Sequence, residues 1–203
     1  MKVALIGATG NIGSKITDEL LSRGRTVTAI ARNPEKAASS DHVKVVQVDA
    51  ADTAKLANAL KGHDAVISSA PFAPGLSESI IAAVKQSGVK RYIMVGGAGS
   101  LEVAPGKMLK DTLDLPEPVK KLLDEAAANL QRLCAEHDLE WTFFSPAAEI
   151  GPGERTGKFR LGGDQLVTDA AGKSRISYDD YAIALVDELE RGQHIRKRFT
   201  IAY

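Results

Sequence analysis

The stretch MKVALIGATGNIGSKI, residues 1–16, decides the fold. Its glycines Gly7, Gly10 and Gly13 are spaced G-x-x-G-x-x-G, close to the G-x-G-x-x-G pattern of dinucleotide-binding loops. The apolar run 2–6 before them predicts a buried strand, and the amphipathic run after them predicts a helix. Glycines punctuate many turns, so the spacing alone is weak evidence. A strand before it and a helix after it make it a candidate phosphate-binding loop.

Each glycine has a distinct expected role in such a loop. Gly7 allows the tight turn, Gly10 lets the backbone approach a pyrophosphate, and Gly13 lets the helix pack closely on the strand. The free N–H groups at the helix start would then face the phosphates, assisted by the helix dipole. The loop residues expected to contact a cofactor are Gly7, Thr9, Gly10, Asn11, Ile12 and Gly13.

The rest of the chain alternates short apolar runs with longer amphipathic segments. The predicted strands are 2–6, 26–31, 43–48, 65–69, 91–95, 140–144 and 198–202. The predicted helices are 13–22, 53–60, 76–86, 118–137 and 179–190. Strands that are apolar on both faces need helices on both sides, which predicts an α/β fold with a Rossmann-type, doubly wound, mainly parallel sheet. We expect one domain over 1–203, with substrate-pocket loops at about 96–118 and 147–178.

The end of the second predicted strand bears on the choice of cofactor. It reads TAIARNPEK, with no acid at its tip and with Arg32 directly after Ala31. An arginine there suits the 2′-phosphate of NADP, so NADP(H) is favoured over NAD(H); the alternative is an exposed loop arginine. Asp49 ends the third strand and is placed to meet the adenine amino group; alternatively, the helix that begins near Thr53 is capped by Asp49 or by Asp52. The other residues expected near the cofactor are Ala50, Ser69, Ala70 and Pro71.

Composition narrows the function classes. The 203 residues carry 26 Lys plus Arg and 26 Asp plus Glu, so nothing argues for a nucleic-acid partner or an anionic membrane. No apolar stretch approaches the roughly 18 residues of a membrane span, and no signal peptide is apparent, so we expect a cytoplasmic protein. The single cysteine, Cys134, is expected to be buried in a helix. The histidines lack metal-ligand spacing, so no metal site is expected.

Motifs along nearly the whole chain resemble a known family. They are GATGNIG, ARNPEK, VDAAD, SSAPF, VGGAGS, WTFFSPAAEIGPGERTGKFRLG, DAAGKSRISYDDYAIALVDELE and RKRFTIAY. Together they are similar to the atypical short-chain dehydrogenase/reductases, specifically the NAD(P)H-binding proteins of the NmrA-like and flavin/biliverdin reductase B-like kinds. The resemblance implies NAD(P)H on the carboxyl edge of the sheet. It also implies that Ser145, Pro146 and Ala147 pack near the nicotinamide end.

The catalytic pair of short-chain dehydrogenases is missing. These enzymes use Tyr-x-x-x-Lys on the helix after the fifth strand, but none of the four tyrosines here has a lysine four residues later. If Lys121 occupies the lysine position, Glu117 falls at the tyrosine position, where a helix-start acid is the better interpretation. Ser100, after the fifth strand, is the candidate hydroxyl, or it is a loop serine that bonds its own backbone.

Two functions follow from these observations. One is reduction of a small planar acceptor, such as a quinone or flavin, by hydride transfer without the Tyr-x-x-x-Lys pair. The other is a non-catalytic NADP(H)-binding protein that senses redox state for a partner. A sugar epimerase or dehydratase is disfavoured because 203 residues leave little room for a larger substrate domain. A small-molecule substrate is expected, and the sequence leaves monomer and homodimer open.

Overall fold

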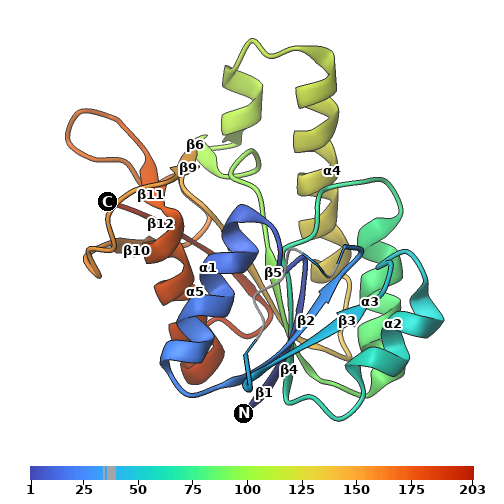
Figure 1. Ribbon diagram of the computed structural model, residues 1–203. Helices are drawn as coiled ribbons and strands as arrows, with labels where there is room; N and C mark the ends of the chain where they lie inside the picture. The colour runs from blue at the N-terminus through green and yellow to red at the C-terminus, as the bar shows by residue number, and fades with distance from the viewer. Residues whose placement is uncertain (34, 36–39) are drawn as a thin grey trace.

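A computed structural model describes residues 1–33, 35 and 40–203 (Figure 1). Its main sheet has the strand order β10-β12-β8-β5-β4-β1-β2-β3. All neighbours are parallel except β10, which runs antiparallel to β12 at one edge. The strands of this sheet are β1 (Lys2–Ile6), β2 (Thr26–Ala31), β3 (Val43–Gln47), β4 (Ala65–Ser68), β5 (Arg91–Val95), β8 (Glu140–Ser145), β10 (Arg160–Gly162) and β12 (Lys197–Ala202).

Helices cover both faces of the sheet, as the sequence predicts. The helices are α1 (Asn11–Ser22), α2 (Thr53–Leu60), α3 (Leu76–Ser87), α4 (Glu117–Cys134) and α5 (Tyr178–Arg191). One apolar core lies between the sheet and the α1–α5 pair, and a second lies between the sheet and α2, α3 and the carboxyl half of α4 (Figure 1). In the described part of the chain, none of these helices has the length and apolarity needed to cross a bilayer.

Strand β1 shows why the apolar runs must be continuous. Val3 and Leu5 pack in the core under α1 and α5, whereas Ala4 and Ile6 pack in the core under α2 and α3. All four side chains are buried. A central parallel strand therefore needs apolar residues at every position, because alternate side chains face the two cores.

The strand order reverses direction between β1 and β4. From β1 the chain moves outward to β2 and β3, and then returns to the other side of β1 as β4 and continues to β5. The two neighbouring connections leave the sheet in opposite directions, so a crevice opens at the carboxyl ends of β1 and β4. The glycine stretch 7–13 lies at this point of the fold.

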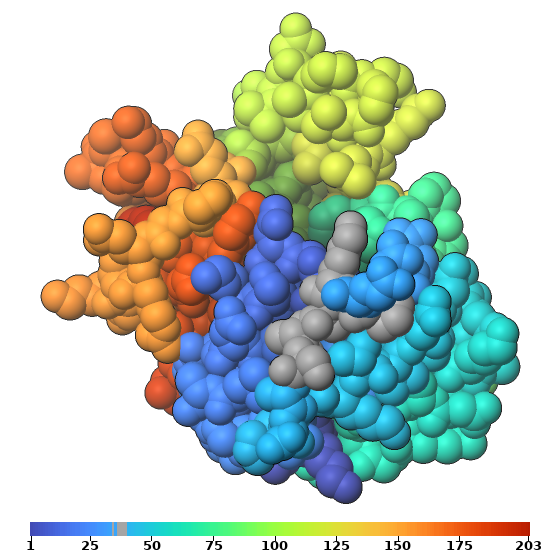
Figure 2. Space-filling view, viewed as in Figure 1, coloured from blue at the N-terminus to red at the C-terminus, as the bar shows by residue number. Residues whose placement is uncertain are grey.

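The two long segments predicted as loops contain short regular elements. The first holds a hairpin of β6 (Glu102–Ala104) and β7 (Lys107–Met108), followed by the 3₁₀ helix η2 (Leu109–Thr112). The second holds β9 (Glu149–Gly151), β11 (Arg175–Ser177), which pairs with β9 in parallel, and the edge strand β10. Together with the first half of α4, the η2 segment stands out above the body of the molecule (Figure 2).

The end of α4 corrects one prediction. The helix ends at Cys134 instead of His137, and the Cys134 side chain is exposed instead of buried. The buried position belongs to its neighbour Leu133, which continues the stripe that begins with Ala126 and Asn129. Because consecutive helix residues are turned by about 100°, one step along the chain moves Cys134 from the core to solvent.

Candidate functional site

Two adjoining pockets form one groove across the carboxyl edge of the sheet. The β2-side pocket, about 720 Å³, lies over the ends of β1, β2, β3 and β4 and reaches the start of α3. The β5-side pocket, about 540 Å³, lies over the ends of β4, β5 and β8 and reaches the start of α1. Residues shared by both pockets join them into one groove; they are Gly10, Ser69, Ala70 and Pro71.

Two glycines of the opening loop are required by the protein's own packing. Gly7 has φ of +80°, and a Cβ placed on it would lie 2.4 Å from the carbonyl oxygen of Ser69. A Cβ on Gly13 would lie 2.1 Å from the carbonyl oxygen of Gly7. No side chain fits at either position, so these glycines hold β1, β4 and α1 together at the crevice.

Gly10 differs, because the protein alone does not require a glycine there. Its φ of −76° and ψ of 167° suit any residue. A Cβ placed on it would have the Gly7 carbonyl oxygen as its nearest heavy atom, 3.4 Å away. Gly10 borders both pockets, so a side chain at this position would occupy the groove or its rim. This is the space that a closely approaching ligand backbone or phosphate would need.

The start of α1 supplies donors for an anion. Gly10 is its N-cap, and no side chain caps the helix. The N–H groups of Asn11, Ile12 and Gly13 occupy the first turn, where no earlier carbonyl of the helix can accept from them. Asn11 and Ile12 also line the β5-side pocket. An uncapped helix start beside an open groove suits a diphosphate.

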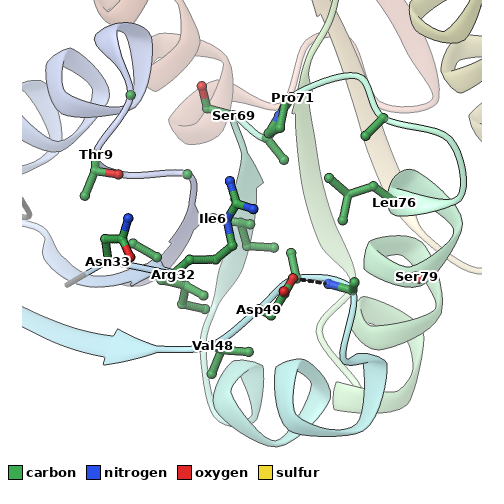
Figure 3. A pocket seen from close by; sticks show the side chains of 18 of the residues that line it. Ile6, Thr9, Arg32, Asn33, Val48, Asp49, Ser69, Pro71, Leu76 and Ser79 are labelled. Atoms are coloured by element: carbon green, nitrogen blue, oxygen red, sulfur yellow. Dashed lines mark hydrogen bonds between the residues drawn. The ribbon is translucent and has the colours of Figure 1, made fainter.

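The predicted adenosine-side residues meet in the β2-side pocket. Arg32 follows β2 with an exposed side chain, and Asp49 follows β3; Figure 3 shows both projecting toward the same space. Of the two residues that could cap α2, Asp52 is the cap, because it accepts from the N–H of Lys55 at 3.1 Å. One Asp49 oxygen accepts from the N–H of Ala51 at 3.0 Å. The other predicted residues that line this pocket are Thr9, Ala50, Ser69, Ala70 and Pro71.

Only part of the ARNPEK motif can be placed beside this pocket. Its Pro34 and Lys36 lie outside the described residues. Arg32 is held at the strand end through its backbone, since its carbonyl oxygen accepts from the Gln47 side chain at 3.0 Å. The backbone of Arg32 is therefore fixed at the strand end, and Arg32 lines the pocket.

The turn after β8 contributes only part of what was expected. Pro146 and Ala147 line the β5-side pocket, but Ser145 does not. Ser145 is the last residue of β8, its side chain is fully buried, and its Oγ has no hydrogen-bond partner among the described residues. The chain turns toward the groove one residue later, at Pro146.

Ser100 is placed away from both pockets. Its Oγ and its carbonyl oxygen both accept from the guanidinium of Arg198, at 3.0 and 2.9 Å. Arg198 also pairs with Asp164 at 2.7 Å. The hydroxyl therefore serves a structural bond to β12 and contacts neither the groove nor its own loop backbone.

The β5-side pocket carries no charged side chain among its described lining residues. Its walls are glycine, alanine, proline and larger apolar side chains such as Leu109, Leu113 and Leu123. The polar side chains on it are those of Asn11, Ser69 and Tyr178. Such a pocket suits an uncharged, flat, apolar group with a few polar atoms.

Leu123 of α4 lines the β5-side pocket from outside both predicted pocket loops. Tyr178 lies within one of those loops but was not predicted as a site residue. It ends the segment 147–178 and begins α5, so its position in a predicted pocket loop was a usable signal. By contrast, Glu117 and Lys121, which occupy the expected positions of the missing catalytic pair, are exposed on α4 and line neither pocket. Among the described residues, no group of three His, Cys, Asp or Glu side chains is arranged to hold a metal ion.

Comparison with known proteins places this groove in context. YwnB of Bacillus subtilis, an uncharacterized protein, is 38% identical over 211 residues, which span 99% of this chain and 98% of YwnB. An NAD(P)H azoreductase of Xenophilus azovorans is 28% identical over 149 residues, 71% of this chain and 47% of that protein.

Solved structures that share the fold of this chain have been given different candidate activities. A candidate epimerase from Bacteroides thetaiotaomicron is 43% identical with a TM-score of 0.94, covering 100% of this chain and 96% of that chain. A candidate NADH-flavin reductase from Streptococcus pneumoniae is 39% identical with a TM-score of 0.87, covering 100% and 99%. A family model described as NAD(P)H-binding matches residues 7–191, from the first glycine of the opening loop to the end of α5. This chain therefore belongs to the NAD(P)H-binding family with a Rossmann fold.

Proposed function

We propose that this protein is an oxidoreductase that binds NADP(H) in preference to NAD(H) and reduces a small, uncharged, planar acceptor of the quinone or flavin type. The observation that carries this proposal is the β5-side pocket, which lies directly beside the glycine loop and has no charged side chain among its described lining residues. A reduced nicotinamide supplies hydride, and a flat conjugated acceptor stacked beside it can receive that hydride.

The groove divides naturally between the two halves of a dinucleotide. The first turn of α1 would bind the diphosphate, with Gly10 leaving room for it. In the β2-side pocket, Arg32 would bind the 2′-phosphate and Asp49 would accept from the adenine amino group. The nicotinamide end would then lie along Ser69, Ala70 and Pro71, which line both pockets, toward Pro146 and Ala147.

The acceptor pocket favours neutral ligands for an electrostatic reason. A charged ligand that leaves water needs an opposite charge or several hydrogen bonds, and this pocket offers no charged side chain among its described lining residues. Apolar side chains from η2 and α4, including Leu109 and Leu123, would instead pack against a planar ring and exclude water. The names of two relatives, an azoreductase and a candidate flavin reductase, also refer to conjugated acceptors.

A redox-sensing role is the second candidate, and one feature favours it. The projecting η2–α4 arm exposes Leu113, Val119 and Leu122 to solvent, and Leu113 also lines the acceptor pocket. A partner bound to this arm would contact the groove directly. This role predicts NADP(H) binding without turnover and an affinity for the partner that depends on the cofactor's redox state.

Steady-state oxidation of NADPH, followed at 340 nm with a panel of quinones, free flavins, uncharged azo dyes and small carbonyls, separates the two roles. The oxidoreductase proposal expects turnover with at least one planar acceptor and little with the carbonyls. Measurable NADPH binding without turnover on any acceptor would overturn it. In that case a pull-down with NADP⁺-loaded and NADPH-loaded protein would test the sensing role.

A further inference from the structure

We propose that Tyr178 is the proton donor to the acceptor, a catalytic role on α5 and not on the helix that carries the tyrosine of short-chain dehydrogenases. This inference rests on the proposed function of the same groove. Hydride addition to a quinone or an azo group leaves negative charge on an oxygen or nitrogen. A donor must neutralise that charge, and the described lining residues of the pocket include no charged side chain to do so.

Of the polar side chains considered for this proton donor, only Tyr178 remains. Ser69 is common to both pockets, and Asn11 stands at the diphosphate-binding helix start, so both belong with the cofactor. Ser100 is bonded to Arg198 outside the groove, and Ser145 is buried in β8. Tyr178 lies on the part of the pocket that the cofactor side does not share.

The other tyrosines have different tasks. Tyr181 is fully buried and donates to the carbonyl oxygen of Phe144 at 2.6 Å. Tyr92 is fully buried in the core, and burial raises the pKa of its hydroxyl well above the ordinary value. Tyr203 donates to Asp180 at 2.9 Å. Of the four tyrosines, Tyr178 alone is partly exposed and also lines the groove, which suits a group that must regain a proton from water after each turnover.

Local structure holds Tyr178 in position. Ser177, the residue before it, pairs with Gly151 across the β9–β11 ladder and caps α5 by accepting from the N–H of Asp180 at 3.0 Å. Asp179, the residue after it, pairs with Lys15 of α1 at 3.1 Å. The start of α5 is thereby fixed against the start of α1, which lines the same pocket.

The step balances without any group beyond those named. The reduced nicotinamide gives up a hydride and is oxidised by two electrons. The acceptor gains that hydride at one atom and the phenolic proton of Tyr178 at the conjugated oxygen or nitrogen. An O–H bond of the tyrosine breaks, a new O–H or N–H bond forms, and water returns a proton to the tyrosine.

The direct test compares the wild type with Tyr178→Phe, which keeps the ring and removes only the hydroxyl. We expect kcat to fall at least tenfold, and more on an azo acceptor than on a quinone, because an azo anion is the stronger base. The Kd for NADPH should stay within twofold. Tyr203→Phe is the matched control: it also removes a hydroxyl beside the start of α5, but from outside the pocket. An unchanged kcat in Tyr178→Phe on both acceptors would overturn the inference.

A second measurement does not depend on turnover. 4-Nitrophenol serves as a stable mimic of the anion formed on the acceptor, and its phenolate is visible in the absorption spectrum. A hydroxyl that donates to the bound oxygen should raise the ratio of phenolate to phenol at least tenfold over Tyr178→Phe in the NADP⁺-loaded protein. Equal ratios in the two proteins would overturn the inference. If the wild type shows no turnover but the phenolate ratio differs as expected, the proposed function fails while the placement of Tyr178 stands.

Discussion

The packing of the protein requires glycine at Gly7 and Gly13 but not at Gly10, where we expect the glycine to leave room for a bound diphosphate. Gly10→Val tests this expectation. The Gly10 backbone already lies in the extended region, and among the described residues a Cβ placed on Gly10 would have only the Gly7 carbonyl oxygen within 4 Å, at 3.4 Å. Valine at the helix N-cap is less favourable than glycine. Loss of a glycine also lowers the conformational entropy of the unfolded chain, which stabilises the folded protein by about 0.4–1 kcal/mol. These terms oppose each other, so we expect the free energy of unfolding to change by less than about 1 kcal/mol.

The effect of Gly10→Val on binding should be much larger. A valine side chain would displace a diphosphate from the first turn of α1, and each charge-assisted hydrogen bond lost costs about 1.5–3 kcal/mol. The loss of one such bond corresponds to a roughly 10- to 150-fold rise in the Kd for NADPH. Isothermal titration calorimetry measures this rise, and thermal unfolding followed by circular dichroism measures the stability.

Two further variants make the result interpretable. Gly163→Val changes an exposed glycine outside both pockets, with no heavy atom within 4 Å of a Cβ placed on it, so it should leave NADPH binding unchanged and change the free energy of unfolding by less than about 1 kcal/mol. Gly13→Ala forces a Cβ to 2.1 Å from the Gly7 carbonyl oxygen, so it should lower both, with a loss of stability of about 1–3 kcal/mol or more. If Gly10→Val binds NADPH within threefold of wild type, or destabilises as much as Gly13→Ala, the reasoning about this loop is refuted.

Three other predictions concern the ends of strands and helices. Arg32→Ala should raise the Kd for NADP⁺ about tenfold and leave that for NAD⁺ within twofold; equal losses for both would exclude a role with the 2′-phosphate. Asp52→Ala should cost about 1 kcal/mol of stability through the lost α2 cap without changing NADPH affinity. Asp49→Asn keeps an oxygen that can accept from the N–H of Ala51, so it should weaken NADPH binding and leave the melting temperature in place. Asp180→Asn should lower the melting temperature at pH 7 by a few degrees, since 1 kcal/mol corresponds to about 2–4 °C in a chain of this size. Burial alone would raise the pKa of Asp180, but hydrogen bonds from Thr156, Gly157 and Tyr203 outweigh it and lower that pKa below 3.8. Its stabilisation is therefore complete above about pH 4 and is lost as the pH falls through the folded-state pKa, so the difference between wild type and Asp180→Asn should shrink in acid.

The regular elements of the main sheet could be predicted from sequence because their signal is local. Strand β5 and helix α2 have the predicted bounds, 91–95 and 53–60. In each case a continuous apolar run or an amphipathic period is closed by polar or turn residues. Such patterns depend only on which face meets the core, and that requirement is the same wherever the element lies in the sheet.

The short strands could not be predicted in the same way. Strand β10 has three residues, 160–162, and exists because it pairs with β12 about forty positions later. Likewise β9 and β11 each have three residues and pair across an intervening segment. Their stability comes from long-range hydrogen bonds, and three residues carry no readable periodicity.

The lining of the β2-side pocket was predictable from sequence, and that of the β5-side pocket was less so. The glycine loop, Arg32 and Asp49 follow strand ends whose convergence is set by topology. Ser100 and Tyr178 differ because their roles depend on tertiary neighbours. Arg198 binds Ser100 from a strand nearly a hundred residues away, and the β9–β11 ladder brings Tyr178 to the pocket.

Calorimetric titration of the wild-type protein with NADPH and with NADH tests the central claim most directly. The groove at the carboxyl edge of the sheet predicts one binding site per chain and a Kd for NADPH about tenfold or more below that for NADH, the worth of one charge-assisted bond to the 2′-phosphate. A lower Kd for NADH would contradict the assignment of Arg32. Absence of binding by either nucleotide would contradict the assignment of the groove itself.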